Sequence, residues 1–272
     1  MSVREALRAP AAPVRLADLD PRATPLVADR ASAEAEFAAR AEELYPLQEK
    51  LFAERTRSVL LVLQGMDGSG KGGAIRHVAG QLNPNSLAVR SFKTPTEEEL
   101  AHHFLWRIHP HVPGPGRIAM FDRSHYEDVL IVRVHGMVGP DELETRYEDI
   151  AAFEADLASQ GTAIVKAFLH ISREEQCERM VARLDQPKKH WKFNPGDLDE
   201  RERWDEYVDA YETALGRCNP DSAPWYVIPS DRKWYRNWAL QSLLLETLLD
   251  LDPRYPVRDD LDIPALRARL DC

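Results

Sequence analysis

Residues 60–73 read Leu-Leu-Val-Leu-Gln-Gly-Met-Asp-Gly-Ser-Gly-Lys-Gly-Gly, and this stretch decides the fold. Its four apolar residues predict a buried parallel strand, and the pattern from about 72 to 82 predicts a helix. The turn between them has the form G-x-x-x-x-G-K. Its glycines let successive N–H groups point at anionic oxygens, and Lys71 can bridge phosphates. A glycine-rich turn without a ligand is the alternative, but the flanking strand and helix both favour a phosphate-binding loop.

Two residues depart from the usual form of this loop. Gly72 stands where a Ser or Thr hydroxyl would normally ligate Mg²⁺. Asp67 places a carboxylate inside the loop, where phosphates would repel it. The carboxylate makes sense if a metal ion lies between, or if it handles a proton. An exposed turn aspartate is the alternative.

The composition limits the classes of function. The chain has 272 residues, 44% hydrophobic and 29% charged, which suits one large α/β domain. A net charge of −10 argues against a general nucleic-acid binder. The three cysteines lie far apart and form no metal or disulfide pattern, so a reducing cytoplasm is expected. No apolar run approaches ~18 residues, so no membrane span is expected, and no targeting peptide is recognised.

A second half of the site is expected after residues 118–122, an apolar strand that ends in Asp122. Ligands of a parallel sheet lie at the carboxyl ends of its strands, so Asp122 should lie beside Lys71 and hold Mg²⁺ directly or through water. Arg123 follows at once and could touch a phosphoryl group or a structural carboxylate. A helix N-cap is the alternative role for Asp122.

The remaining pattern alternates strands with helices. Strands are expected at 87–92, 163–169 and 225–228, and helices at 31–57, 141–159, 172–184, 197–216 and from Ser230 or Asp231 to 249. A capping box at Thr96 predicts a further helix that carries the apolar residues at 104–108. Pro46 should bend or interrupt the helix in which it lies.

Three segments flank or interrupt this pattern. Residues 1–30 lack periodicity and predict an arm on the surface, which a partner subunit could also receive. From Arg179 to Lys192 the chain carries five Lys or Arg against one acid, an excess of +4 in an acidic protein. Together with the helical residues on either side, this predicts a basic lid over a polyanion at about 179–200. A solvated basic face is the alternative. The tail 253–272 is expected to be irregular.

Several motifs resemble the second polyphosphate kinase family over about residues 30–255. They are Gly65-Met66-Asp67, Gly70-Lys71, Ser91-Phe92-Lys93, Phe121-Asp122-Arg123-Ser124-His125-Tyr126 and Arg183-Leu184-Asp185-Gln186-Pro187-Lys188. The resemblance implies one P-loop kinase-like domain, a three-layer α/β sandwich with a central parallel sheet and a helical lid. It also implies Mg²⁺, with Mn²⁺ as an alternative, and a homodimer or homotetramer. The substrates would be inorganic polyphosphate and purine nucleotides, with AMP and ADP converted reversibly to ADP and ATP.

The resemblance also implies roles for individual residues. Asp67 and Asp122 would be the acidic metal and catalytic pair, with Lys71 and Arg123 beside them. Loop, lid and resemblance together place the phosphate ligands at Gly68, Ser69, Gly70, Lys71, Lys93, Arg133, Arg183, Lys188 and Lys189. Many relatives carry an acid where this chain has Gly72, which affects how the metal would be bound.

The acceptor is the last point that the resemblance addresses. His125-Tyr126-Glu127-Asp128 is similar to the branch that accepts both AMP and ADP. AMP has one phosphate fewer than ADP, so it must lie deeper to react at the same centre, which leaves space and a different charge balance around the metal. Glu127 could compensate for both by holding a Mg²⁺-bound water. Simple pairing of Glu127 with an arginine is the alternative.

Two other functions compete with this hypothesis. An ATP-dependent nucleoside monophosphate kinase would share loop, lid and sheet, but the missing Ser or Thr after Lys71 and the presence of Asp67 count against it. A nucleotide- or polyphosphate-binding regulator without turnover is opposed by the intact acidic and basic residues of the loop.

Overall fold

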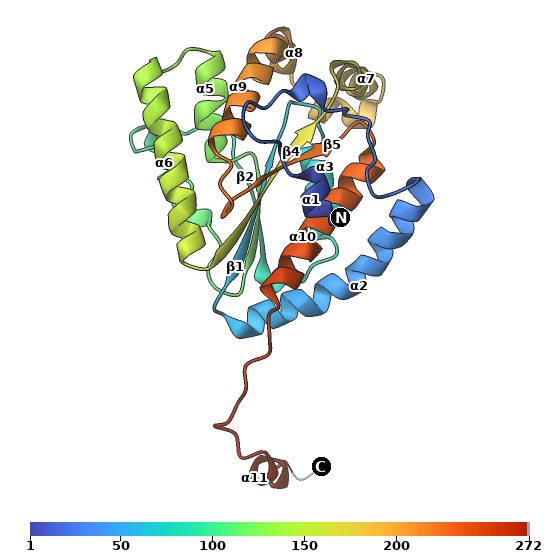
Figure 1. The fold of residues 1–272 in the computed structure, drawn as a ribbon, viewed down its shortest axis with the longest axis vertical. Helices are drawn as coiled ribbons and strands as arrows, with labels where there is room; N and C mark the ends of the chain where they lie inside the picture. Colours follow the sequence, from blue (N-terminus) through green and yellow to red (C-terminus); the bar gives the residue numbers. More distant parts are fainter. Residues whose placement is uncertain (271–272) are drawn as a thin grey trace.

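Five parallel strands form one sheet at the centre of the chain, in the order β2-β3-β1-β4-β5. The computed structural model describes residues 1–270 and is shown in Figure 1. The strands are β1 (Ser58–Gln64), β2 (Leu87–Ser91), β3 (Ile118–Asp122), β4 (Thr162–His170) and β5 (Trp225–Pro229). Every residue of β1 is buried, because β1 lies in the middle of the sheet and both of its faces are covered.

Helices cover both faces of the sheet, which gives the expected three layers. On one face lie α6 (Pro140–Ser159) and α9 (Trp204–Arg217), packed on Leu60, Val62 and Phe121. The other face carries α1 (Val3–Leu7), α2 (Arg30–Glu54), α3 (Lys71–Ala79) and α10 (Lys233–Leu251). Figure 1 shows α6 and α2 on opposite sides of the sheet. The α/β sandwich with a central parallel sheet is confirmed.

The remaining helices are short. They are η1 (Leu16–Asp18), η2 (Pro84–Ser86), α4 (Glu97–Leu100), η3 (His109–His111), η4 (His125–Val129), α5 (Ile131–Val134), α7 (Arg173–Leu184), η5 (Pro187–Lys192), α8 (Gly196–Glu202) and α11 (Ile263–Ala268). Within residues 1–270 no helix combines the length and the apolar character that a membrane crossing needs.

The connections place a crevice between β1 and β3. The chain leaves β1 through α3 on one face of the sheet and leaves β3 toward α6 on the other face. Such a reversal opens a crevice at the carboxyl ends of the two strands. Leu63 and Asp122 are register partners at that edge, so the two halves of the predicted site do meet there.

Several local expectations were wrong. The helix that begins after Thr96 ends at Leu100, and the next residues form turns. Arg107 explains part of this, because its guanidinium donates to the Lys93 carbonyl (2.9 Å) and holds the segment against the rest of the chain. Helix α2 runs through Pro46 without interruption, so the expected break at this proline is wrong. The single helix expected at 197–216 is instead two helices, α8 and α9, with Arg203 between them. Helix α10 has Arg232 as its N-cap, with no side-chain capping bond.

The two ends of the described chain behave differently. Residues 1–30 lie against their own chain: Val3 and Leu7 are buried, Glu246 of α10 accepts from the Val3 N–H, and Arg8 forms a β-bridge to Tyr226. The segment after α10 instead extends away from the body, as Figure 1 shows, and it contains the short helix α11, whereas an irregular tail was expected.

Candidate active site

The loop after β1 has the geometry of a phosphate-binding loop. Gly65, Gly68 and Gly70 all have positive φ values, of 149°, 84° and 95°. Residues with a side chain rarely adopt this backbone conformation. A Cβ at Gly65 would also lie 2.8 Å from the Leu169 carbonyl oxygen. The sequence therefore needs glycine here, and Gly70 leads directly into the N-terminus of α3, whose free N–H groups and dipole favour anions.

Lys71 is buried at the start of α3 and folds back over the loop. Its Nζ donates to the Gly65 carbonyl oxygen at 2.7 Å and lies 3.9 Å from Asp67 Oδ1. Burial lowers the pKa of the Lys71 ammonium, and the Asp67 carboxylate opposes that shift. The amine thus lies within the loop, where it can reach a phosphate.

Asp67 and Arg123 form the centre of the site. Arg123 Nη2 donates to Asp67 Oδ1 at 2.6 Å. Burial opposes ionisation of Asp67, but Lys71 and Arg123 outweigh it and hold the pKa of the carboxyl below its usual value. Arg123 has a φ of 62°, a left-handed conformation that is uncommon outside glycine and often found at functional sites. Its Nε also lies 3.8 Å from Glu127 Oε2.

Asp122 lies at the end of β3 and faces the same loop. The Ser91 hydroxyl donates to Asp122 Oδ2 at 3.3 Å. Ser124, not Asp122, caps the following helix η4, so the N-cap alternative does not hold. A Cβ at Gly72 would lie 3.5 Å from Asp122 Oδ2, which places the position of the missing hydroxyl beside this carboxylate.

The donors around Asp122 fit a divalent cation that shares its ligands with a substrate. Hard cations such as Mg²⁺ prefer oxygen, and they are commonly bound by one or two carboxylates together with substrate phosphates. Asp122 and Ser91 supply such oxygens, and Asp67 lines the same cleft. Residues 1–270 contain no cluster of three or more His, Cys, Asp or Glu able to hold a metal, so phosphate oxygens and water would complete the shell.

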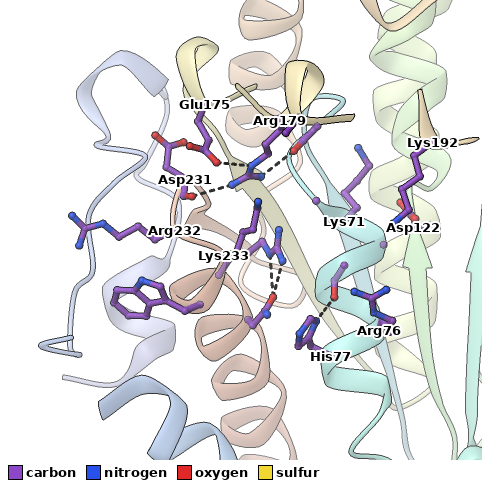
Figure 2. Close-up of a pocket in the computed structure, with 18 of the residues that line it drawn as sticks. Lys71, Arg76, His77, Asp122, Glu175, Arg179, Lys192, Asp231, Arg232 and Lys233 are labelled. Carbon is purple, nitrogen blue, oxygen red and sulfur yellow. Dashed lines mark hydrogen bonds and ion pairs between the residues drawn. The ribbon is translucent and has the colours of Figure 1, made fainter. Parts of the chain in front are cut away.

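A basic cleft of about 1340 Å³ opens in front of the loop. Eleven Lys or Arg side chains and five acidic ones line it. Figure 2 shows several of them converging from α3, α7 and α10. The basic residues are Arg30, Lys71, Arg76, Arg123, Arg179, Arg183, Lys189, Lys192, Arg232, Lys233 and Arg236. In a protein of net charge −10 this is a strong local concentration of positive charge.

A second, mixed cleft of about 650 Å³ adjoins the basic cleft at Asp67 and Arg123. Five basic and five acidic residues line it, with apolar and aromatic side chains between them. The apolar and aromatic part consists of Met66, Phe92, Pro95, Leu100, Ile131, Val132, Met137, Val138, Trp204, Tyr207 and Tyr211. The two clefts share Asp67 and Arg123, so these side chains lie where the contents of both would meet.

Two arginines that sequence analysis did not assign to the site hold the loop in place. The Arg179 guanidinium donates to the carbonyls of Gly68 (2.9 Å) and Ser69 (2.8 Å), and its contacts with Glu175 and Asp231 are visible in Figure 2. Arg236 donates to the Ser69 carbonyl at 3.1 Å. Burial, assisted by Arg179, lowers the pKa of Arg236 to about 9. Charge alone in the sequence does not reveal which arginines turn inward.

The structure brings most of the expected ligands to the clefts. Gly68, Gly70, Lys71, Arg183 and Lys189 line the basic cleft, and Lys93 and Glu127 line the mixed cleft. Arg183 is held by an ion pair with Asp197 at 3.2 Å. Ser69 does not line either cleft, because its side chain is buried within the loop.

Two further expected ligands lie outside both clefts. Arg133 pairs with Asp209 on α9 and lines neither cleft. Lys188 is exposed and also lines neither cleft. The geometry therefore gives no support to phosphate contacts at these two positions, because one side chain is already paired and the other points to solvent.

A loop with phosphate-binding geometry, beside a strand that ends in a carboxylate and open to a cleft lined by cationic side chains, is the arrangement of a P-loop phosphotransferase. The family model of polyphosphate kinase 2 matches residues 27–255. The chain belongs to the polyphosphate kinase 2 family, and it is a polyphosphate kinase.

Relatives and solved structures agree with this assignment. An AMP/ADP-polyphosphate phosphotransferase of Meiothermus ruber is 51% identical over 78% of this chain and 80% of its own length. An ADP-polyphosphate phosphotransferase of Rhodopseudomonas palustris is 43% identical over 79% and 78%. The crystal structure of polyphosphate kinase 2 from Arthrobacter aurescens has a TM-score of 0.96 and 47% identity, over 100% of this chain and 97% of that one.

Proposed function

We propose that the basic cleft binds inorganic polyphosphate, that the mixed cleft binds AMP or ADP, and that the phosphoryl group passes between them at Asp67 and Arg123. The observation that carries this proposal is that the two clefts differ in character and share these two residues. In-line transfer requires donor and acceptor to approach one centre from opposite sides.

The basic cleft suits a long polyanion. It presents six more cationic than acidic side chains, and a cleft lined by one sign of charge concentrates ligands of the opposite sign. Lys189 and Lys192 come from η5, within the segment expected to be a lid. We assign residues 179–200 to a lid over polyphosphate that is anchored to the loop at its first residue, Arg179. The lid belongs to a single domain with an arm at 1–30 and a tail at 253–272.

The mixed cleft suits a nucleotide. Its volume falls within the usual range for small ligands, roughly 300–1,000 Å³. Aromatic and apolar side chains offer surfaces for a base, while Arg107, Arg123 and Arg146 offer donors for phosphate and ribose oxygens. The relatives named above are described as acting on AMP and ADP or on ADP, in keeping with this assignment.

The residues at the junction supply the chemistry. Phosphoryl transfer depends on positioning and on neutralising the charge of the transferred group. Lys71 and Arg123 provide that neutralisation, and Asp67 orients both of them. Asp122, with Ser91, would hold a divalent cation, Mg²⁺ with Mn²⁺ as an alternative. The bound cation would neutralise phosphate charge and orient phosphate oxygens. No covalent intermediate with a side chain is needed.

Glu127 is the candidate that allows both acceptors. It lines the mixed cleft, and its carboxylate lies 3.8 Å from Arg123. The pairing of Glu127 with an arginine, considered above as the alternative, is thus present only as a loose contact. The carboxylate remains able to compensate for the missing phosphate charge when AMP replaces ADP. The proposed reactions are AMP to ADP and ADP to ATP, and they are reversible.

One donor–acceptor matrix tests the proposed function. Purified protein with Mg²⁺ is assayed with polyphosphate or ATP as donor and with AMP, ADP, GMP or GDP as acceptor. Transfer from polyphosphate to AMP and to ADP is expected. Transfer to AMP from ATP alone would favour a nucleoside monophosphate kinase, and the absence of turnover would favour a regulator.

We also propose that the protein acts in the cytoplasm as a homodimer or homotetramer. Free Cys177 and Cys218 suit a reducing compartment. Light scattering coupled to size exclusion measures the subunit number, and a monomeric mass at assay concentration would contradict this proposal.

A further inference from the structure

A polar cluster lies in the core directly behind η4. Glu154 of α6 and Lys166 of β4 are 1% and 0% exposed, and His125 and Tyr126 of η4 are fully buried. Charged side chains are rarely buried to this degree, because the lost hydration is costly, and apolar residues in their place would often be as stable or more so. The cluster therefore needs an explanation other than core stability.

The four side chains form one connected network. Glu154 Oε1 accepts from the Tyr126 hydroxyl (2.8 Å) and from His125 Nε2 (3.2 Å), and Glu154 also pairs with Lys166. Lys166 Nζ donates in addition to the Tyr126 hydroxyl oxygen (2.9 Å) and to the Cys218 carbonyl (2.8 Å). Burial opposes ionisation of Glu154, but Lys166 and His125 hold the pKa of its carboxyl below the usual value.

This network anchors the inner side of a short helix whose outer side faces the mixed cleft. His125, Tyr126 and Val129 are buried in the core, whereas Glu127 and Asp128 line the cleft. A 3₁₀-helix of five residues has few and poorly aligned internal hydrogen bonds. Its position must therefore be set by contacts to the rest of the fold, and the network ties it to α6, β4 and the end of α9.

A second contact holds the start of η4 to the phosphate-binding loop. The Ser124 hydroxyl oxygen accepts from the Tyr126 N–H (3.2 Å) and from Gln64 Nε2 (3.1 Å), and Gln64 is the last residue of β1 before the loop. A shift of η4 would therefore move the carboxylates of the mixed cleft relative to the loop.

We infer that the Glu154–Lys166 pair is a positioning device for the nucleotide acceptor: through Tyr126 it fixes η4, and with η4 it fixes Glu127 and Asp128 in the mixed cleft. The inference rests on the proposed function, since that assigns the acceptor to this cleft. Neither Glu154 nor Lys166 lines either cleft, so both act through η4.

Steady-state kinetics of two single variants test the inference. Tyr126→Phe removes one hydroxyl without changing the ring, and Glu154→Gln removes the charge while retaining the shape. Each should raise the KM for ADP and for AMP about 10- to 100-fold, because small displacements of positioning groups have effects of that order. The effect on ADP is expected through Asp128 of η4, which pairs with Arg107 (3.2 Å) and Arg146 (3.6 Å) of the mixed cleft. The KM for polyphosphate should change by less than about twofold, since the basic cleft is untouched.

A matched control and a double variant separate positioning from folding. Val165 neighbours Lys166 on β4 but packs on the opposite face of the sheet, so Val165→Ala should lower the melting temperature without changing either KM. The double variant Glu154→Leu/Lys166→Met removes both charges and should regain thermal stability relative to Glu154→Gln. It should not regain acceptor affinity, because Tyr126 still lacks its partners.

Calorimetric titration with ADP keeps the inference distinct from the proposed function. If the wild type fails to bind ADP, or fails to use it with polyphosphate, the proposed function is rejected. If the wild type binds ADP and Tyr126→Phe binds it equally well, the positioning role is overturned. Recovery of both stability and ADP affinity by the double variant would also overturn it. Tyr126→Phe decides the matter if Glu154→Gln does not fold.

Discussion

Replacement of Asp67 by asparagine should abolish most of the turnover while leaving substrate binding intact. The carboxylate lies 2.6 Å from Arg123 Nη2 and 3.9 Å from Lys71 Nζ. At an effective dielectric constant of roughly 20, one such pair at 4 Å is worth about 4 kcal/mol. At about 1.36 kcal/mol per factor of ten, this corresponds to about 10³ in rate for a pair at the Lys71 distance. We expect kcat to fall about 10²- to 10³-fold, the size typical for loss of a preorganised charge contact.

The assay and its control follow from the charge of the site. Loss of a negative charge beside phosphates should not raise the KM for polyphosphate, so the defect should appear in kcat alone. Glu144→Gln removes a carboxylate from another arginine pair, with Arg217, that lines neither cleft, and it should retain wild-type kcat. A variant Asp67→Asn with kcat within about threefold of wild type would refute the central role of this carboxylate.

Three further predictions concern the acceptor, the lid and the metal. Glu127→Asn should lower the rate with AMP about tenfold or more and leave the rate with ADP unchanged. Burial raises the pKa of Glu127, so on acidification the wild-type rate with AMP should fall at a higher pH than an ordinary glutamate would give. Equal effects on both acceptors would contradict the role of Glu127. Lys189→Ala should raise the KM for polyphosphate and reduce its salt dependence, whereas Lys188→Ala should do neither; identical behaviour of the two would indicate a solvated face. Gly72→Asp adds a carboxylate beside Asp122, where a Cβ meets only ordinary contact at 3.5 Å. This variant should lower the Mg²⁺ concentration needed for the half-maximal rate, and a magnesium titration that gives the wild-type concentration would contradict the prediction.

The sheet and its loop could be predicted because local sequence specifies them. Apolar runs such as 60–63 and 118–121 are buried on both faces, and such strands need no knowledge of their neighbours to be recognised. Glycines with positive φ in the loop carry the same local information. Asp122 and Lys71 line the same cleft, as predicted, because parallel strands end at one edge of the sheet.

Other features depend on contacts between distant residues and left no local signal. Residues 104–108 have apolar positions typical of a helix, yet they form turns in which Leu105 and Ile108 are buried. Tertiary contacts override helix propensity here. The packing of residues 1–30 depends on a few side chains such as Val3, without any repeat to detect. Arg179 and Arg133 look alike in sequence, but one clamps the loop and the other pairs with Asp209.

In the proposed reaction, polyphosphate and nucleotide occupy separate clefts at the same time and react directly at Asp67 and Arg123. Initial rates measured while polyphosphate and ADP are varied together test it most directly. We expect intersecting double-reciprocal lines, because both substrates must be bound before transfer. Parallel lines, with a phosphorylated protein isolated after incubation with polyphosphate alone, would show transfer through the enzyme and contradict it.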